Sequence, residues 1–492
     1  MTKPIDDQIT SESLDPTNWD EARETAHQMV DEMIDYLSSI RTRPAWQSVP
    51  DEVKAALTQD VPREGAPLAS VFEEFKDNIL PYPTGNLHPG FFGWVMGNGT
   101  FTGAMGDALA SMMNAHVAGY DQSASLVERQ VIAWLSELLG FPKTSSGILV
   151  SGGTMANLNG VIVARHAKAG FDIRQHGLQV NGAPRLRIYG SAETHSWINT
   201  ACELMGLGRD GFRAVPVNNA FQIDVAACRA MIEADIATGD KPFCLMGTVG
   251  TVNTGAIDDL PALRALADDF DLWFHIDGAF GALAAWGEDT KDLVKGQDLA
   301  DSIAFDLHKW GYMPYDVGCV LTRNPDAQNH AFGQAASYLA PTTRGLAVAN
   351  TYFADKGLQL SRSFRGLKVW MSLKEQGVDR IGRVISRNVA QAKYLEQLIA
   401  EHDDLEILAP VSLNAVCYRF VDPDLSEDEL DALNEEILLR IQESGSAVPS
   451  HTFIDGKFAI RVCITNHRTE ARDIKQLVAD TRRHAAEAKR AI

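Results

Sequence analysis

Residues 301–310 read Asp301-Ser-Ile-Ala-Phe-Asp-Leu-His-Lys-Trp310 and join an apolar run to a polar end. The run from Ile303 to Phe305 is short and typical of a buried strand. Lys309 follows it, between a histidine and a tryptophan. Desolvation at such a place lowers the pKa of an amine and makes it nucleophilic, as Schiff-base chemistry with a carbonyl cofactor requires. A lysine that simply extends into solvent is an equal alternative on this stretch alone.

Strand-like runs alternate with helical stretches on both sides of this segment, from about residue 145 onward. The predicted strands are Gly147–Val150, Leu186–Tyr189, Phe243–Gly247, Leu272–Ile276, Asp301–Phe305 and Gly318–Leu321. Helical periodicity between them predicts helices at Thr154–Ala169, Thr194–Met205, Val225–Ala237 and Ala262–Asp269. This alternation predicts an α/β fold with a mostly parallel central sheet flanked by helices. Ligands bind at the carboxyl ends of the strands in such sheets, so functional residues are expected there.

The two ends of the chain follow other patterns. Residues 17–40 have apolar residues at helical spacing and predict an amphipathic helix. A proline-marked stretch follows, and we expect this whole start to wrap around a larger body or a partner subunit. Beyond residue 380, a long helix, strands and further helices predict a small α+β domain. We therefore divide the chain into an N-terminal helical segment 1–98, a large domain 99–380 and a small domain 381–492.

Composition excludes several classes of partner. The 492 residues include 44 Lys and Arg against 65 Asp and Glu, a net charge of −21. Nucleic acids and anionic membranes need basic surface, so neither is expected as a main partner. The 6 cysteines are scattered without a C-x-x-C pair, which favours reduced thiols. The start of the chain lacks a signal-peptide pattern, and no apolar run approaches the ~20 residues that span a bilayer. We expect a cytoplasmic protein.

Two strand ends carry the first candidate ligand contacts. The segment Ser151-Gly-Gly-Thr-Met-Ala-Asn157 follows a strand and opens a helix, where free backbone N–H groups and the helix dipole favour an anion. Its spacing matches neither a dinucleotide fingerprint nor a nucleoside-triphosphate loop. A plain turn capped by Thr154 is the alternative. The segment Gly190-Ser-Ala-Glu-Thr-His-Ser-Trp197 places His195 near a helix start at another strand end, where a capping or packing role is the alternative.

The strand Leu272–Ile276 ends at Asp277, which is followed by small residues. A carboxylate at the end of an apolar strand is expected to be buried and to need a cationic or hydrogen-bonding partner. Its alternative role is structural, as the cap of the next turn. His275 lies on the same face of this strand, but no third ligand follows at suitable spacing, so we predict no metal site.

An anion site, a histidine, an aspartate and a lysine therefore occur at successive strand ends of one predicted sheet. This set suits pyridoxal 5′-phosphate (PLP). Its phosphate would lie on the glycine turn, and an aspartate would keep the pyridine nitrogen protonated. An imidazole would stack on the ring and a lysine would hold the aldehyde carbon.

The chain also resembles the group II PLP-dependent amino-acid decarboxylases, the family of aromatic-L-amino-acid and glutamate decarboxylases. The most specific matches are His308-Lys309-Trp310, Phe274-His-Ile-Asp277-Gly-Ala279, Ser151-Gly-Gly-Thr154, Glu193-Thr-His195-Ser and Ser363-Phe-Arg-Gly-Leu-Lys-Val-Trp370. Their order and spacing match as well, and the likeness covers almost the whole chain. The resemblance implies a type I PLP-enzyme fold, and it makes segment 99–380 the PLP-binding domain. It also implies a homodimer whose active site lies at the subunit interface, with segment 1–98 packed on the partner.

The resemblance implies roles for individual residues. Lys309 corresponds to the Schiff-base lysine, Asp277 to the partner of the pyridine nitrogen, and Ala279 and His195 to the residues on the two ring faces. The other implied cofactor contacts are Gly152, Gly153, Thr154, Thr251, Asp306 and His308. Thr251 is our choice among the threonines of the loop 248–254. Asp306 stands where the aromatic enzymes usually have asparagine, and an aspartate there would repel a phosphate.

The implied reaction is decarboxylation of an aromatic or related L-amino acid to its amine and CO2, through a Schiff base and a quinonoid intermediate. The family has a mobile loop after the lysine whose tyrosine protonates the intermediate. That loop corresponds here to residues 334–357, with Tyr352 as the candidate donor and Tyr338 as a weaker one. Phe353 beside it keeps an alternative open, because relatives with phenylalanine in this role resemble aldehyde synthases.

The resemblance also implies substrate contacts, most of them in the aromatic and glycine-rich segment 86–100, for which a tightly packed buried turn is an equal alternative. The candidates are Asn86, Phe92, Trp94, Val95 and His116, some of them from the partner subunit. Asn86 and His116 replace aromatic residues of the aromatic-amino-acid enzymes and make the pocket more polar, so a non-aromatic or smaller amino acid is a possible substrate. Decarboxylation of an acidic or diamino acid also stays open. An aminotransferase or desulfurase on the same fold, and a relative without catalytic activity, also stay open as functions of the chain.

Overall fold

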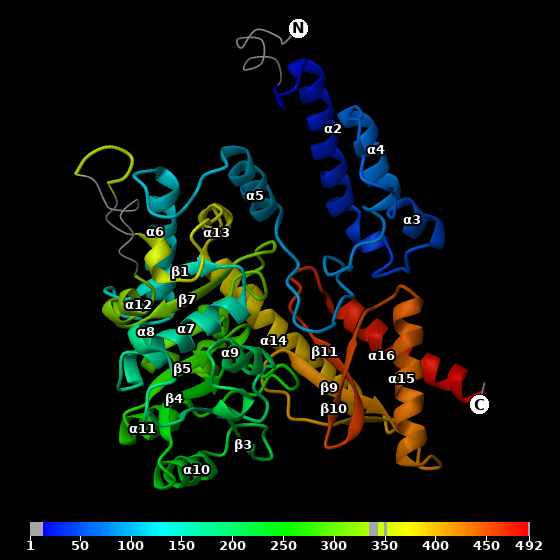
Figure 1. Ribbon diagram of the computed structural model, residues 1–492. Helices are drawn as coiled ribbons and strands as arrows, with labels where there is room; N and C mark the ends of the chain where they lie inside the picture. Colours follow the sequence, from blue (N-terminus) through cyan, green and yellow to red (C-terminus); the bar gives the residue numbers. More distant parts are fainter. Residues whose placement is uncertain (1–12, 334–342, 349–351, 491–492) are drawn as a thin grey trace.

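The structure is a computed structural model that describes residues 13–333, 343–348 and 352–490. It contains a large domain around a seven-stranded sheet and a small domain around a four-stranded sheet, with a group of N-terminal helices that extends away from both (Figure 1). Within these described ranges, no helix combines the length and apolarity that crossing a bilayer requires.

The central sheet has the strand order β1-β7-β6-β5-β4-β2-β3. Its strands are β1 (Ser146–Val150), β2 (Leu186–Ser191), β3 (Phe212–Val215), β4 (Lys241–Thr248), β5 (Trp273–Asp277), β6 (Ser302–Asp306) and β7 (Gly318–Thr322). The strands from β6 to β3 pair in parallel, and β7 runs antiparallel to both of its neighbours. Sequence patterns predicted six of these strands and the mostly parallel sheet. They missed β3 and the reversed direction of β7.

Helices cover both faces of this sheet. On one face α7 crosses strands β4 to β7, and on the other α10 and α11 lie against β4. The helices of the large domain are α5 (Phe101–Met113), α6 (Ser123–Leu138), α7 (Gly153–Lys168), α8 (Ile173–His176), α9 (Trp197–Leu204), α10 (Val225–Ala237), α11 (Leu260–Asp269), α12 (Pro325–Phe332) and α13 (Gly366–Gln376). Every residue of β1, β5, β6 and β7 is buried, which explains why these strands read as nearly continuous apolar runs.

The small domain contains an antiparallel sheet of order β10-β11-β9-β8. Its elements are α14 (Val378–Ala400), β8 (Leu405–Ile407), β9 (Ala415–Phe420), α15 (Glu427–Glu443), β10 (Ser450–Ile454), β11 (Lys457–Cys463) and α16 (Ala471–Lys489). Its own hydrophobic core joins the sheet to these three helices. The predicted boundary at residue 380 falls inside α14, which packs against both domains.

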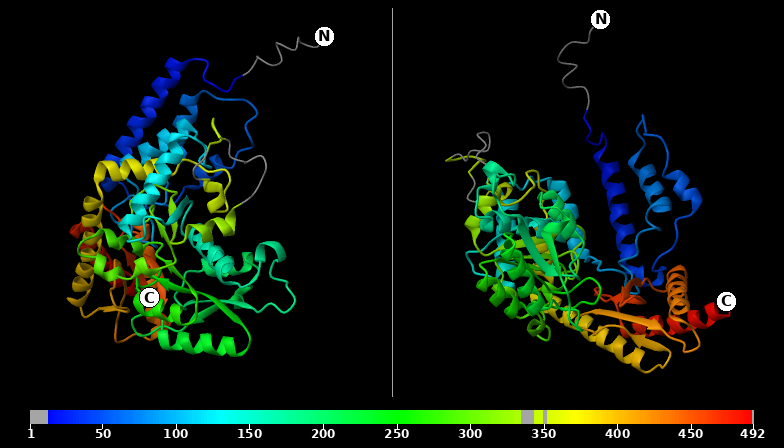
Figure 2. Two further views of the ribbon diagram at one scale, coloured as in Figure 1. Left: turned by 90° about the vertical axis from the view of Figure 1, so that its left-hand side faces the viewer. Right: turned by 60° about the horizontal axis from the view of Figure 1, so that its bottom comes forward.

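The N-terminal helices α2 (Trp19–Ser38), α3 (Asp51–Ala56) and α4 (Leu68–Asn78) lie apart from the central sheet, and their lower ends meet the small domain (Figures 1 and 2). Asn18 caps α2 by accepting from two backbone N–H groups of the first turn. The exposed apolar residues of these helices include Val30, Met33 and Ile34 on α2, and Leu68 and Val71 on α4. Within a single chain, this apolar surface faces solvent.

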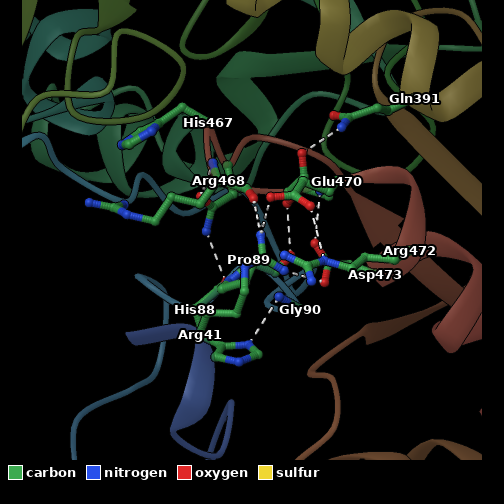
Figure 3. Close-up of polar contacts among 12 residues, drawn as sticks. Arg41, His88, Pro89, Gly90, Gln391, His467, Arg468, Glu470, Arg472 and Asp473 are labelled. Atoms are coloured by element: carbon green, nitrogen blue, oxygen red, sulfur yellow. Dashed lines mark hydrogen bonds and ion pairs between the residues drawn. The ribbon is translucent and has the colours of Figure 1, made fainter. Parts of the chain in front are cut away.

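Arg41 attaches the N-terminal helices to the start of α16 (Figure 3). Its guanidinium donates to the carboxylate of Asp473 at 2.7 Å, to the carbonyl oxygen of Arg468 at 2.6 Å and to Glu470 at 3.1 Å. Nearby, the hydroxyl of Thr469 donates to the carbonyl oxygen of Pro89 at 2.8 Å. These contacts fix the point from which α2 extends.

Candidate active site

A cavity of about 490 Å³ opens at the carboxyl ends of β2, β4, β5 and β6, beside the turn that follows β1. Ten residues predicted from the sequence line it: Trp94, Gly152, Gly153, Thr154, His195, Asp277, Ala279, Asp306, His308 and Lys309. Val95 also contributes to its wall. The parallel sheet therefore brings together side chains that are more than 150 positions apart in the sequence, as the rule for strand ends predicts.

Lys309 lies in the turn after β6 and extends its amine toward the carboxylate of Asp306. The distance from Nζ to Oδ2 is 3.0 Å, and 24% of the Lys309 side chain remains exposed. Burial lowers the pKa of this amine, but the charge and hydrogen bond of Asp306, helped by the charge of Asp277, outweigh it and raise the pKa above its ordinary value. The expectation of a lowered pKa for Lys309 is therefore wrong for this chain. The carboxylate of Asp306, three residues away, favours the charged form of the amine.

Asp277 ends β5 with both carboxylate oxygens in hydrogen bonds. Oδ2 accepts from the indole Nε1 of Trp197 at 2.7 Å, and Oδ1 accepts from the backbone N–H of Ala279 at 3.0 Å. The carboxylate thus has the partners that its burial requires and also holds the following turn. His275 lies two residues back with its ring nitrogens bonded to Ser302 and Asn157, each at 2.8 Å. No group of three or more metal-ligating side chains occurs among the described residues.

The glycine turn lies at the start of α7. A Cβ atom at Gly153 would approach Asp306 Oδ2 to 2.8 Å, and one at Gly152 would approach the His308 ring to 3.0 Å, so this turn has no space for side chains. Among the described residues no side chain caps α7, so the alternative of a turn capped by Thr154 is wrong. The free N–H groups of the first turn and the helix dipole remain available to an anion.

His195 lies in the cavity wall just before α9. Its Nδ1 accepts from the backbone N–H of Trp197 at 3.2 Å, which leaves Nε2 to carry the proton of a neutral ring. Desolvation lowers the pKa of His195 and outweighs the opposing charge of Asp277. The ring is therefore neutral near pH 7.

Thr251, the threonine chosen from the sequence, does not line the cavity. Its hydroxyl oxygen lies 3.0 Å from that of Thr254 and accepts from the backbone N–H of Ala256, so it closes a tight turn. Thr248 lines the cavity instead, at the end of β4. The sequence contained a signal for Thr248, because it directly ends an apolar strand.

Three of the expected substrate contacts lie outside the cavity within this chain. Phe92 is 1% exposed and belongs to the core of the small domain. Asn86 donates through its amide to the carbonyl oxygen of Gly97 at 2.5 Å. His116 bonds to the carbonyl oxygen of Leu360 and contacts the Tyr120 ring, with the ring centres 5.7 Å apart.

Tyr352 also lies outside the cavity of its own chain. Its ring meets that of Tyr120 edge-on, with the ring centres 6.4 Å apart. The residues 334–342 and 349–351 of the expected loop, including Tyr338, lie outside the described residues.

Several residues line the cavity without having been predicted: Asn157, Glu193, Trp197, Thr248, Phe280 and Tyr315. Glu193 lies two residues before His195, and Trp197 lies two residues after it. The strand end that identifies His195 in the sequence therefore identifies these two residues as well. Tyr315 contacts His308 with ring centres 4.5 Å apart. It lies beyond a turn, and nothing in the sequence pattern places it there.

Comparisons with known proteins agree with this geometry. The family model for the pyridoxal-dependent decarboxylase conserved domain matches residues 50–421. An aromatic-L-amino-acid decarboxylase of Bacillus atrophaeus is 32% identical over 465 residues, covering 93% of this chain and 94% of the relative. The crystal structure of Oryza sativa TDC with PLP and tryptamine matches with a TM-score of 0.88 and 26% identity, over 97% of this chain and 100% of that one. Rhodiola rosea 4-hydroxyphenylacetaldehyde synthase matches with a TM-score of 0.86 and 25% identity, over 96% and 99%.

The cavity fits pyridoxal phosphate, the cofactor present in the Oryza sativa structure. It combines an amine for an aldehyde, a buried carboxylate for a pyridine nitrogen, and a turn whose glycines leave backbone N–H groups open to a phosphate. The match to the family model and the 32% identity over nearly the whole chain are decisive. The chain belongs to the pyridoxal-dependent decarboxylase family and is a PLP-dependent amino-acid decarboxylase with the type I fold.

Proposed function

We propose that this enzyme converts an aromatic L-amino acid to its amine and CO2 in the cavity around Lys309. The observation that carries the proposal is the convergence of Lys309, Asp277 and the Gly152–Thr154 turn on one cavity. Bound PLP supplies an electron sink for the charge left on Cα when the carboxylate leaves. The residues of the chain hold it, orient the substrate and move protons.

We assign the cofactor contacts from this geometry. The turn Gly152–Thr154 would hold the phosphate at the start of α7, and His308 lies beside that turn. Asp277 would keep the pyridine nitrogen protonated, and its hydrogen bond from Trp197 fixes the carboxylate. Ala279 and His195 would lie on the two ring faces. Lys309 would carry the cofactor between turnovers.

We propose that Tyr352 returns a proton to Cα. The tyrosine lies outside the cavity of its own chain, beside Tyr120 and near His116. It therefore acts in the cavity of a partner subunit or after a movement of its segment. This placement supports a homodimer in which Tyr352 and His116 serve the neighbouring site.

The dimer has further support in the N-terminal helices. We propose that segment 1–98 packs on the partner subunit, that residues 99–380 form the PLP-binding domain and that residues 381–492 form the small domain. The apolar face of α2 and α4 is exposed in the single chain, as expected of a surface that a partner covers. We also place the enzyme in the cytoplasm, since its cysteines are free and buried.

The lining of the cavity favours an aromatic substrate. Trp94, Val95, Phe280 and Tyr315 give it an apolar and aromatic wall. Among the described residues that line it, Lys309 is the one lysine or arginine, so a second substrate carboxylate would lack a cationic partner. Acidic substrates are disfavoured for this reason. The Bacillus atrophaeus relative, named for aromatic amino acids, supports the same choice.

An aldehyde synthase is the second candidate, and the Rhodiola rosea structure is the observation behind it. Tyr352 and His195 favour simple decarboxylation, because a proton donor at Cα leads to the amine. The two reactions differ in their products, since the synthase also releases ammonia and hydrogen peroxide.

A product assay tests the proposal. The purified enzyme with added PLP is offered a panel of aromatic, acidic and diamino L-amino acids, and CO2, amine and peroxide are measured in parallel. We expect CO2 and amine in equal amounts from an aromatic substrate, without peroxide. The Lys309→Ala variant should lose the absorbance band of the bound cofactor and this activity. Turnover restricted to acidic or diamino acids would refute the substrate assignment.

A further inference from the structure

Asp306 is buried beside the amine of Lys309, and one of its oxygens has no protein partner. Asp306 ends β6 and is 1% exposed. Its Oδ2 lies 3.0 Å from Lys309 Nζ. Its Oδ1 is buried and has no hydrogen-bond partner among the described residues. A buried carboxylate with a free oxygen is costly, so this position is expected to serve a function.

Two glycines keep space for this carboxylate. A Cβ at Gly153 would lie 2.8 Å from Oδ2, and a Cβ at Gly318 would lie 2.6 Å from Oδ1. Gly318 pairs directly with Asp306 across the β6–β7 ladder. The carboxylate thus occupies a fitted site between the glycine turn and the lysine.

The amine of Lys309 needs a proton acceptor before it can react. Its neighbour Asp306 favours the ammonium form, which has no lone pair and cannot attack an aldehyde. His308 is unsuited to accept the proton, because its Nδ1 already accepts from the backbone N–H of Val317. Both oxygens of Asp277 are already in hydrogen bonds. Asp306 is the carboxylate within hydrogen-bonding distance of Nζ.

We propose that Asp306 is the proton acceptor that activates Lys309 toward the aldehyde of the cofactor, and the donor that restores its ammonium when the lysine is released. The inference rests on the proposed role of Lys309. During condensation one ammonium proton passes to Asp306, and the other two hydrogens of the amine leave with the aldehyde oxygen as water. The carboxyl group then becomes neutral, which removes a negative charge from beside the turn that would hold the phosphate.

The rate of cofactor attachment tests this role without an activity assay. Cofactor-free full-length enzyme is mixed with PLP, and the absorbance of the imine is followed between about pH 6 and pH 9. The wild-type rate of imine formation should vary little over this pH range, because Asp306 accepts the proton of the Lys309 ammonium. In Asp306→Asn two effects oppose each other. Loss of the carboxylate lowers the pKa of Lys309 and so favours the free amine. Loss of the proton acceptor should outweigh this effect, so the rate at pH 7 should fall at least about tenfold and rise with pH.

Two further variants separate proton transfer from a structural role. Asp306→Ala leaves a space beside Nζ, and added formate should restore a flat profile there, while formate should leave Asp306→Asn unchanged. Glu193→Gln alters another carboxylate of the cavity, which accepts a hydrogen bond from the Asn253 amide, and it should keep the wild-type pH profile. A pH profile in Asp306→Asn identical to that of the wild type would overturn the proposal, as would absence of rescue by formate.

A labelling experiment distinguishes a failure of the proposed role of Lys309 from a failure of the proposed role of Asp306. Borohydride reduction of the loaded wild-type enzyme should fix the cofactor to the peptide that contains Lys309. If the cofactor is fixed elsewhere, the proposed role of Lys309 fails. If it is fixed on Lys309 and the Asp306 variants behave as the wild type does, the role of Asp306 alone fails.

Discussion

Asp277 places a carboxylate in the wall of the cavity at the end of β5, and a substitution that removes its charge tests its role. In Asp277→Asn the side chain keeps its size but no longer favours a protonated pyridine nitrogen. We expect kcat/KM to fall at least about 100-fold, equivalent to about 2.7 kcal/mol of transition-state stabilisation. Steady-state assays with the identified substrate measure this loss, and absorbance confirms that the cofactor still binds.

Trp197→Phe provides the matched control for Asp277. This variant removes the indole N–H that donates to Oδ2 but keeps the carboxylate. A smaller loss, about tenfold, is expected because the charge remains and only its orientation is relaxed. Equal losses in the two variants would contradict the importance of the charge.

His275 makes the stability of the fold depend on pH. Burial lowers its pKa to about 4, against about 6.5 in an unfolded chain. Its contribution to stability is therefore complete above about pH 6.5 and lost as the pH falls to about 4, a change of about 3 kcal/mol. Denaturant unfolding between these pH values should show a shallower fall in the free energy of unfolding for His275→Gln.

Two comparisons isolate this effect. Asp258 has the opposite effect on the pH dependence of stability, because burial raises its pKa to about 6. It is present in both the wild type and His275→Gln, so its contribution cancels when the two are compared. His176 is exposed on α8, and His176→Gln should leave the pH dependence of unfolding as in the wild type. Parallel curves for wild type and His275→Gln would show that His275 is not the acid-sensitive group.

At the scale of elements, a buried ion pair joins α6 to β1 and to the segment before α13. Arg362 and Glu128 are in contact, and both side chains are fully buried. Arg362 also donates to the carbonyl oxygens of Val117 and Leu149, each at 2.7 Å. In Arg362→Leu the charge of Glu128 loses its partner, and we expect the free energy of unfolding to fall by about 3–5 kcal/mol.

The double variant Glu128→Leu with Arg362→Leu tests the cause. It removes both charges, so it should be more stable than Arg362→Leu alone. Denaturant titrations of the wild type, both single variants and the double variant form a complete cycle. Strictly additive losses would mean that the two charges are not coupled.

Elements were predictable where their sequence pattern was strong. The apolar runs of β1, β2, β4, β5, β6 and β7 identified these strands to within a few residues. β3 and β8 are short edge strands that contain charged residues, so their sequences lack an apolar run. The direction of β7 depends on the connection 307–317, which is too short to hold a crossover helix and therefore returns the chain antiparallel.

At the scale of the whole molecule, the exposed apolar face of the N-terminal helices predicts a dimer. Val30 and Met33 lie one turn apart on α2, with 43% and 38% of their surfaces exposed. The double variant Val30→Lys with Met33→Lys should give a folded monomer, because it places charges in the proposed interface. Sedimentation should show the mass of two chains for the wild type and of one for this variant.

Ile236→Lys is the control for the dimer. Ile236 is 47% exposed on α10, at the opposite end of the molecule from α2 (Figure 1). This variant should remain dimeric and active. If Tyr352 serves the partner's cavity, the monomeric variant should bind PLP but lose turnover. A wild-type enzyme that is monomeric and active would contradict the proposed dimer.

Local sequence patterns were sufficient to predict the alternation of strands and helices, the sheet that follows from it, and the strand ends where Gly152, Asp277 and Lys309 would meet. These features depend on local hydrophobic periodicity, which each segment carries alone. The folded chain was needed to show that Thr248 rather than Thr251 lines the cavity, that Tyr352 lies outside it, and that Asp306 pairs with Lys309. Such pairings depend on side-chain directions and on segments distant in the chain, so the charge that raises the pKa of Lys309 becomes apparent only in the folded protein.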